Sequence, residues 1–185
     1  RKLIKKSIID YINKTLLWHE HSSRELLDLF VSTATKPLHP LNSKRLNNYL
    51  LGFTLTGRDL FWSEYMRKQY GSGSIYKLIS WIENQSLEKI TADQAACVLT
   101  VLSWTLGTTV KLLRNRATRC LFIIGKIQPD ELFKSLLAMV QVDDPYIRER
   151  VLAAGYGVAM ACNDLEKKYI PQVLLPSAKK IYFLF

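Results

Sequence analysis

The sequence predicts an all-α protein, built from helices that pair and stack on one another. Apolar residues recur at spacings of three and four positions, as in Ile75, Leu78, Ile79 and Ile82, and this spacing is typical of one buried helix face. No segment sustains an alternation of apolar and polar residues, and no Asn-Gly or Asp-Gly hairpin turn occurs. We therefore expect about nine or ten helices joined by short connections, and no α/β fold.

The first ninety residues are predicted to contain five of these helices. Apolar positions from Leu3 to Leu16 share one face, and Ser22 with Glu25 forms a capping box that is expected to open a second helix. The segment 36–40 is a predicted linker, because residues before proline avoid the helical conformation. Shorter helices are expected over residues 43–51, from Thr56 onward, and from Ile75 onward after a Gly-Ser-Gly-Ser break.

The rest of the chain carries clearer helix-start signals. Thr91 and Gln94 form another capping box. Asp144 as N-cap, with Pro145 as the first helical residue, predicts a helix that runs to about Cys162. Further helices are expected over residues 112–127, after a first-turn Pro129, and in a final segment that is interrupted at Pro171 and Pro176.

An internal repeat favours a solenoid over a closed bundle. The string Leu113-Arg114-Asn115-Arg116-Ala117 resembles Ile147-Arg148-Glu149-Arg150-Val151 at an offset of 34 residues. An apolar residue followed by arginine, close to small residues that allow helices to approach, is similar to a HEAT repeat. We expect a HEAT-like α–α superhelix over residues 91–185 and a divergent helical part over residues 1–90, in one continuous array. The small residues are Ala117, Ala153, Ala154 and Gly155.

Composition and charge fit a packed domain with a polar partner. Hydrophobic residues make up 48% and charged residues 23% of the 185 residues, which supports a core and argues against disorder. The formal net charge of +10 predicts a nucleic-acid partner, an acidic protein partner, or a basic part of a larger, more neutral protein. The chain begins without methionine and ends on an apolar run, so we expect it to be a fragment of a longer protein.

The cysteines and the hydropathy indicate a cytoplasmic protein. Cys97, Cys120 and Cys162 are odd in number and far apart in sequence, so they are expected to be reduced thiols rather than a disulfide framework. No apolar run approaches the length of a membrane span.

Four stretches carry a resemblance to a known family. They are Arg58-Asp59-Leu60-Phe61-Trp62-Ser63, Trp104-Thr105-Leu106, the segment Leu113–Leu121, and the segment Asp144–Ala159 with its Asp-Pro-Tyr, Glu-Arg and Tyr-Gly elements. Over roughly residues 58–159 the chain resembles the C-terminal helical region of bacterial antiviral STAND NTPases. One departure is Asn115, where an aspartate is expected after the arginine, and this weakens any ion pair assigned to that site.

The resemblance implies a parent protein with an N-terminal effector, a central ATP-binding switch domain, and this helical array as its sensor. In that arrangement the sensor binds a viral protein by its shape, and binding drives oligomerisation. ATP and magnesium would bind elsewhere in the parent protein, and this chain would hold no cofactor, no metal and no catalytic residue.

Residue patterns for other chemistry are weak. Gly71–Ser74 lacks the GxxxxGK[ST] spacing of a phosphate-binding loop, so it is interpreted as a connection. His19 and His21 fall on different faces of a helix, which disfavours a shared metal. The histidines and cysteines lie in different parts of the sequence and no GxSxG elbow occurs, so no catalytic nucleophile is predicted. The tryptophans at helical positions, Trp62, Trp81 and Trp104, are predicted to lie in the core.

A series of basic residues is the remaining candidate site. One interpretation is a basic ridge that binds nucleic-acid phosphates or an acidic protein. The other is that about half of these residues pair with Asp143, Asp144 or Glu149 and hold neighbouring repeats together. The second is favoured for Arg114 and Arg148, and both stay open for the others. The series comprises Lys111, Arg114, Arg116, Arg119, Arg148 and Arg150.

The function predicted from these observations is protein recognition. We expect a non-catalytic segment of a STAND-type defence protein, in contact with a protein ligand and with the rest of its own polypeptide. The alternative is a HEAT-like module that binds the nucleic-acid backbone through the basic ridge. A helical-repeat hydrolase or glycosylase is a third possibility, supported by the fold class alone.

Overall fold

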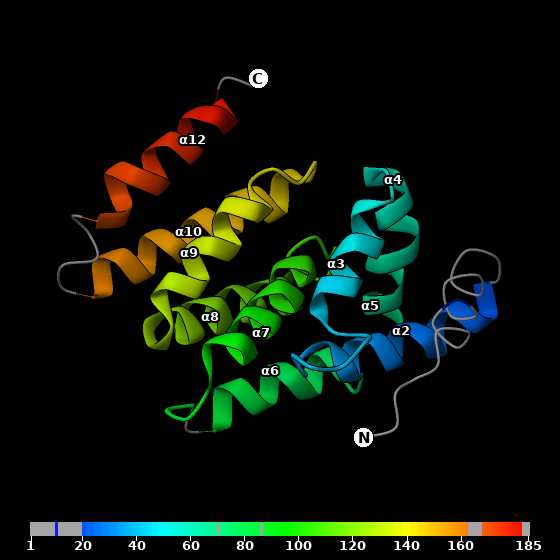
Figure 1. The fold of residues 1–185 in the computed structure, drawn as a ribbon. Coiled ribbons are helices and arrows are strands. Elements are labelled where there is room, and N and C mark those ends of the chain that lie inside the picture. The colour runs from blue at the N-terminus through cyan, green and yellow to red at the C-terminus, as the bar shows by residue number, and fades with distance from the viewer. Residues whose placement is uncertain (1–9, 11–19, 70, 86, 163–167, 183–185) are drawn as a thin grey trace.

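A computed structural model describes residue 10 and residues 20–69, 71–85, 87–162 and 168–182 of the chain. Its described residues form nine helices, if turns that continue one another without a break are counted together, and they contain no strand. The predicted all-α fold is therefore confirmed (Figure 1). The helix expected between Leu3 and Leu16 lies outside the described residues.

The N-terminal part contains helices of uneven length, joined by loops and turns. They are α2 (Glu20–Ala34), α3 (Ser43–Leu51), α4 (Leu55–Arg58) continued through η1 (Asp59–Ser63) into α5 (Glu64–Lys68), and α6 (Ser74–Asn84). The predicted linker and the short helix over residues 43–51 are confirmed. Two predicted starts are wrong. Ser22 lies inside α2, and Thr54 rather than Thr56 caps α4 by accepting a hydrogen bond from the Gly57 amide.

The segment η1 between α4 and α5 is a π-helical turn. A π-turn holds one residue more than an α-helical turn, and such turns are frequent at functional sites. It contains the buried residues Trp62 and Ser63 and follows the buried Arg58, while Leu60 is 75% exposed. The turn therefore presents one side to the interior and the other to solvent.

The C-terminal part is more regular. It contains α7 (Ala92–Thr105), α8 (Lys111–Ile127), α9 (Pro129–Met139) and α10 (Pro145–Ala161). The capping box that opens α7 is present, and the Asp144 carboxylate accepts hydrogen bonds from the first amides of α10. Helices α8 and α10 both have 17 residues and begin at positions 111 and 145, which is the offset of 34 found in the sequence.

The final described segment differs from its prediction. The chain stays helical through η2 (Ile170–Leu174) and α12 (Leu175–Tyr182), with Pro171 inside the π-turn and Pro176 inside α12. A proline ring clashes with the carbonyl four residues earlier in an α-helix. Pro171 lies at the start of the π-turn, and the chain continues through Pro176 into α12 without a break, so the prolines do not interrupt the helix as predicted.

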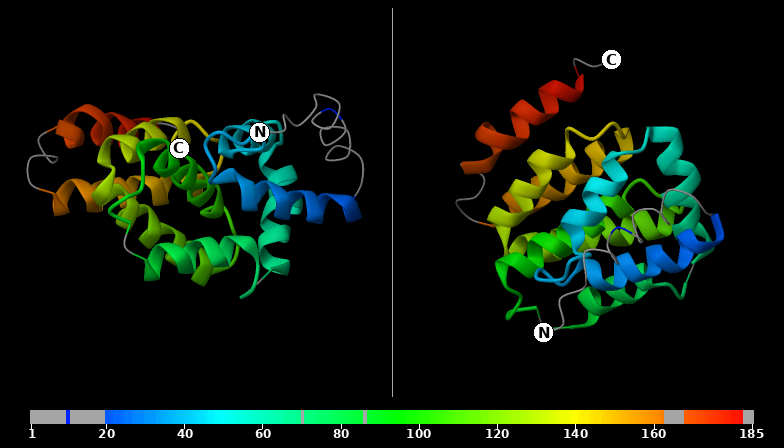
Figure 2. Two further views of the ribbon diagram at one scale, coloured as in Figure 1. Left: turned by 60° about the horizontal axis from the view of Figure 1, so that its bottom comes forward. Right: turned by 45° about the vertical axis from the view of Figure 1, so that its right-hand side comes forward.

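The helices pack in two layers. Helices α6, α8 and α10 follow one another in one layer, whereas α3, α7 and α9 form the other, and α8 also contacts α7 and α9 (Figures 1 and 2). Successive helices thus alternate between layers from α6 onward. These contacts are compatible with the α–α superhelix of helical hairpins that the sequence predicts.

Two glycines allow the layers to approach closely. A Cβ atom at Gly125 of α8 would lie 2.4 Å from a Leu132 methyl and 2.9 Å from a Val158 methyl, and one at Gly155 of α10 would lie 2.4 Å from a Leu136 methyl. The small residues at Ala117, Ala154 and Gly155 are buried as predicted, but Ala153 is exposed and lets no helix approach.

Candidate ligand-binding surfaces

Arg116 of the basic series is used inside the fold. Its guanidinium donates hydrogen bonds to both carboxylate oxygens of Glu83, at 3.3 and 2.6 Å, and to the Ser80 hydroxyl at 3.3 Å. Both side chains of the ion pair are mostly covered, so the pair ties α8 to α6 across the layer. The Arg116 guanidinium lowers the pKa of Glu83, first through its hydrogen bond and then through its charge.

Arg114 and Arg150 connect α8 to α10. The Arg114 guanidinium lies 4.4 Å from the Tyr146 ring centroid, in a cation–π contact, and donates a hydrogen bond to the Thr108 carbonyl. Arg150 donates a hydrogen bond of 3.1 Å to the side-chain oxygen of Asn115. The acceptor is therefore the neutral amide of Asn115 and not a carboxylate.

The acidic partners expected for the arginines were wrongly assigned. Asp144 uses one carboxylate oxygen to accept the Tyr146 and Ile147 amides, and no arginine of the series pairs with Asp143 or Glu149 within the described residues. Arg148 is half-buried, and its Nε has no hydrogen-bond partner among those residues. The arginines do connect neighbouring helices, but their partners are Glu83, Tyr146 and Asn115.

Lys111 and Arg119 are the members of the series that stay exposed. Neither side chain has a hydrogen bond or an ion pair within the described part of the chain. Of the basic ridge predicted from sequence, these two exposed cations lie eight positions apart on α8, and the charge of Arg119 contributes to the lowered pKa of Glu83.

A buried polar junction that the sequence did not indicate joins the N-terminal part to the hairpins. Arg58 is 6% exposed and donates hydrogen bonds to the carbonyls of Phe53 and Asp143, the second residue being 85 positions away. Nearby, the Ser63 hydroxyl donates to the Gly107 carbonyl at 3.1 Å. The junction satisfies loop carbonyls that have no helical partner.

Asp144 belongs to the same junction. Its second carboxylate oxygen packs over Gly107, where an added Cβ would lie 2.8 Å away, so only glycine leaves it room. Burial raises the pKa of Asp144, against the lowering effect of its backbone hydrogen bonds and of the Arg58 charge. The junction is thus a structural element whose buried carboxyl group is harder to ionise than in water.

The three tryptophans of the described residues divide into two groups. Trp62 and Trp104 are buried as predicted; the Trp62 indole donates to the Trp104 carbonyl, and the Trp104 indole donates to Asn47 of α3 at 2.9 Å. Trp81 was predicted to lie in the core but is 44% exposed. Its indole N–H has no hydrogen-bond partner within the described residues.

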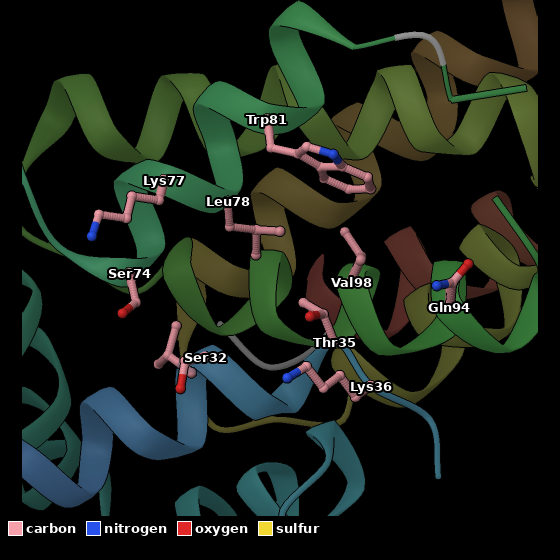
Figure 3. A pocket seen from close by; sticks show the side chains of 10 residues that line it. Ser32, Thr35, Lys36, Ser74, Lys77, Leu78, Trp81, Gln94 and Val98 are labelled. Carbon is pink, nitrogen blue, oxygen red and sulfur yellow. The ribbon is translucent and has the colours of Figure 1, made fainter. Parts of the chain in front are cut away.

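Trp81 lies at a pocket of about 430 Å³ between α2, α6 and α7 (Figure 3). Leu78 and Trp81 project from α6 toward Val98 of α7, and Val31 of α2 completes an apolar lining. This volume is at the lower end of the range of about 300–1,000 Å³ found for ligand pockets. The remaining lining residues are Ser32, Thr35, Lys36, Ser74, Lys77 and Gln94.

The charge of this pocket has one sign. Lys36, which follows α2, and Lys77 of α6 are cationic, and no acidic residue is found among the described residues that line the pocket. Neither ammonium group has an ion pair in the described part of the structure. The site can therefore accept an apolar group together with negative charge.

A second pocket, of about 470 Å³, lies between the 37–42 loop, α3, α7 and α9. Its charged lining residues are Lys44 and Asp93, of opposite sign, and most of its other lining side chains are small or polar. It therefore offers neither a strong charge preference nor an exposed aromatic side chain.

Among the thiols, Cys120 is harder to ionise than a free cysteine. Burial raises the pKa of the Cys120 thiol to about 12, and the three cysteines are free. His39 Nδ1 accepts a hydrogen bond from the Leu41 amide at 3.1 Å; His19 and the side chain of His21 lie outside the described residues. No group of three His, Cys, Asp or Glu side chains that could hold a metal is found among the described residues.

Comparison with protein-family models, with curated proteins and with solved structures gives no match. Among the described helices, none combines the length and the apolar character needed to cross a bilayer. The assignment of a function therefore depends on the residues and surfaces of this chain alone.

Proposed function

We propose that this chain is a protein-recognition segment that performs no catalysis itself. The observation that supports this best is the pocket between α2, α6 and α7, where an exposed Trp81 meets apolar residues and two unpaired lysines. Exposed aromatic side chains beside a covered apolar lining are typical of the residues that dominate protein–protein binding. Trp62 and Trp104, in contrast, hold the scaffold that presents the pocket.

The larger context that we propose is a STAND-type ATP-binding protein of bacterial antiviral defence, acting in the cytoplasm and sensing a viral protein. The sequence elements around Arg58, Trp104 and Asp144 that resemble this family lie together at the buried junction. A sensor of this kind needs a rigid array with an accessible surface, and stacked helical hairpins supply one. ATP and magnesium would bind elsewhere in the parent protein.

The complete reading frame tests this context. We expect a GxxxxGK[ST] phosphate-binding loop upstream of Arg1, and ATP hydrolysis by the purified full-length protein that a substitution of the loop lysine abolishes. A full-length frame without a phosphate-binding loop would overturn the STAND assignment, while the proposal of protein recognition would stand on the pocket.

Nucleic-acid binding is the second candidate, and its specific support is the net charge of +10 together with the free cations Lys111 and Arg119. Three other members of the series, Arg114, Arg116 and Arg150, are engaged within the fold. Two available cations on one helix support only weak binding to a nucleic-acid backbone, because affinity grows with the number of phosphates neutralised.

A salt titration separates the two candidates. If nucleic acid is the ligand, the affinity for a random DNA duplex falls steeply between about 50 and 200 mM salt. Arg119→Glu then weakens binding, whereas Lys89→Glu, a charge reversal at an exposed position between α6 and α7, is the control. No measurable duplex binding at low salt removes this candidate.

A further inference from the structure

We infer that the pocket between α2, α6 and α7 is a docking site for an acidic segment of a partner protein, which inserts one large apolar side chain between Trp81, Leu78 and Val98. This inference rests on the proposed function and names the chemistry of the partner. It is argued from the lining of the pocket, its charge and its size (Figure 3).

The apolar part of the pocket is the reason to expect that the partner inserts a large apolar side chain. Trp81 is 44% exposed although its neighbours Ile79 and Ile82 on α6 are fully buried. Its indole N–H is unpaired within the described residues, so a ligand carbonyl or carboxylate can accept a hydrogen bond while the ring contacts an apolar group. A partner segment that packs an apolar side chain against Trp81, Leu78 and Val98 therefore buries apolar surface and can also accept a hydrogen bond from the indole N–H.

The cationic part explains the acidic residues of the partner. Lys36, just after α2, and Lys77 of α6 line the pocket beside its apolar residues, and in the described part of the chain neither has a carboxylate partner. The first helical turns of α6 and α7 reach the pocket at Ser74 and Gln94, and helix N-termini carry partial positive charge. Helix α2 contributes its C-terminal turn, whose partial negative charge Lys36 offsets.

The size and position of the pocket favour a polypeptide segment. A volume of about 430 Å³ accommodates one or two large side chains, and the pocket lies between three helices at the protein surface. The inserted side chain can enter between the helices while the backbone of the segment and its carboxylates stay at the margin, where Lys36 and Lys77 lie. Charged groups at such a margin set the rate and the specificity of association more than its final affinity.

Selection from a random peptide library tests the inference directly. The 185-residue chain is immobilised, and a displayed library of random 12-residue peptides is selected on it at low and at physiological salt. We expect the enriched peptides to share a large aliphatic or aromatic residue flanked by aspartate or glutamate. Their affinities are then measured with synthetic, fluorescently labelled copies by anisotropy.

Matched variants locate the binding site. Trp81→Ala and Lys77→Glu are expected to weaken binding of the selected peptides about tenfold or more, because both remove contacts at the centre or margin of the pocket. Leu60→Ala removes an apolar group that is 75% exposed elsewhere, and Lys89→Glu reverses a charge elsewhere; both are expected to leave affinity within about twofold. Circular dichroism checks that each variant is folded.

Each outcome has a definite meaning. Acidic, apolar-anchored peptides that lose affinity in both pocket variants support the inference. Enriched peptides without acidic residues, or peptides whose affinity is unchanged by Trp81→Ala, overturn it but leave protein recognition in place through another surface. A library that yields no enriched peptide also overturns it, whereas the reading-frame test judges the larger context independently.

Discussion

The hairpins α7–α10 and the N-terminal helices α2–α6 use their polar and aromatic side chains in opposite ways. In the hairpins, Arg114, Arg116 and Arg150 contact neighbouring helices, and Lys111 and Arg119 are the members of the basic series that stay exposed. In the N-terminal part, a π-turn and longer connections break the regularity, and Trp81, Lys36 and Lys77 have no polar partner within the described residues and lie around a pocket. The regular part thus uses half of its basic series inside the fold, whereas the irregular part leaves an aromatic and two cationic side chains together at the surface.

The strongest test of this contrast compares the two kinds of tryptophan. Trp104 is fully buried and links α7 to α3 through its bond to Asn47. Trp104→Ala is expected to lower the free energy of unfolding by about 3–5 kcal/mol, from lost burial and a cavity. Trp81→Ala is expected to lower it by less than about 1 kcal/mol, because the side chain is partly exposed. Denaturant unfolding measures both, and equal losses would contradict the division.

The next test concerns the close packing of α8 and α10 against α9, which depends on glycine. Gly125→Val places methyl groups where Leu132 and Val158 already lie, so we expect a loss of about 1–3 kcal/mol from overpacking. The control is Gly157→Ala in α10, whose Cβ would meet only the Phe122 ring at 3.3 Å. Its unfolding free energy is expected to change by less than about 1 kcal/mol, since alanine also favours helix. Equal changes in unfolding free energy for the two variants would contradict the prediction, because they would show that the helices move apart to make room for the added methyl groups.

The ion pair between Glu83 and Arg116 gives a pH-dependent test of the contacts between α6 and α8. Because the folded-state pKa of Glu83 is lowered, its contribution is fully present above the unfolded value of about 4.3 and is lost as pH falls through the folded value. Glu83→Gln is expected to cost about 1 kcal/mol near neutral pH. Thermal unfolding from pH 2 to 7 should show the gap to the wild type closing in acid; a constant gap would exclude the pair as its cause.

Asp144 is expected to have the smallest effect, with the opposite sign. Its folded-state pKa is raised by burial, so its contribution is fully present below the unfolded value of about 3.9 and is lost as pH rises through the folded value. Asp144→Asn keeps a good N-cap and removes the buried charge. We expect a gain of less than about 1 kcal/mol at neutral pH that vanishes in acid.

Asp144→Ala serves as the control for this prediction. It removes the cap as well as the charge, so it is expected to lose about 1 kcal/mol relative to the asparagine variant at every pH. A loss of stability in Asp144→Asn at neutral pH would contradict the prediction, because it would mean that the ionised carboxylate stabilises the junction.

Most local signals were predictable from the sequence, although the starts expected at Ser22 and Thr56 were wrong, and distant pairings were not predictable. The capping box at Thr91 and the Asp144–Pro145 start depend on residues within four positions of each other, and both are present. The contact from Arg58 to the Asp143 carbonyl spans 85 positions, and no local pattern marks it. The partner of Arg116 was missed for the same reason, since Glu83 lies on a different helix 33 positions earlier.

The exposure of Trp81 was mispredicted for a different reason. Helical spacing shows that a residue belongs to a helix with an apolar face, but α6 has more apolar residues than its buried face can cover. Ile75, Ile79 and Ile82 fill the core, and Leu78 and Trp81 fall beside it. Sequence spacing alone assigns such borderline positions to the core, although they are the ones left at the surface for binding.

The π-turn at Asp59–Ser63 has a consequence for insertions and deletions. Each residue of an α-helix advances the chain by about 100° around the axis, so losing one residue from a regular helix turns everything downstream by that amount. The π-turn already holds one residue more than an α-helical turn, so loss of Leu60, which points to solvent, would leave an ordinary α-helical turn and keep the buried Tyr65 and Met66 facing the core. Homologous chains should therefore tolerate a deletion at this position better than one inside α7 or α8.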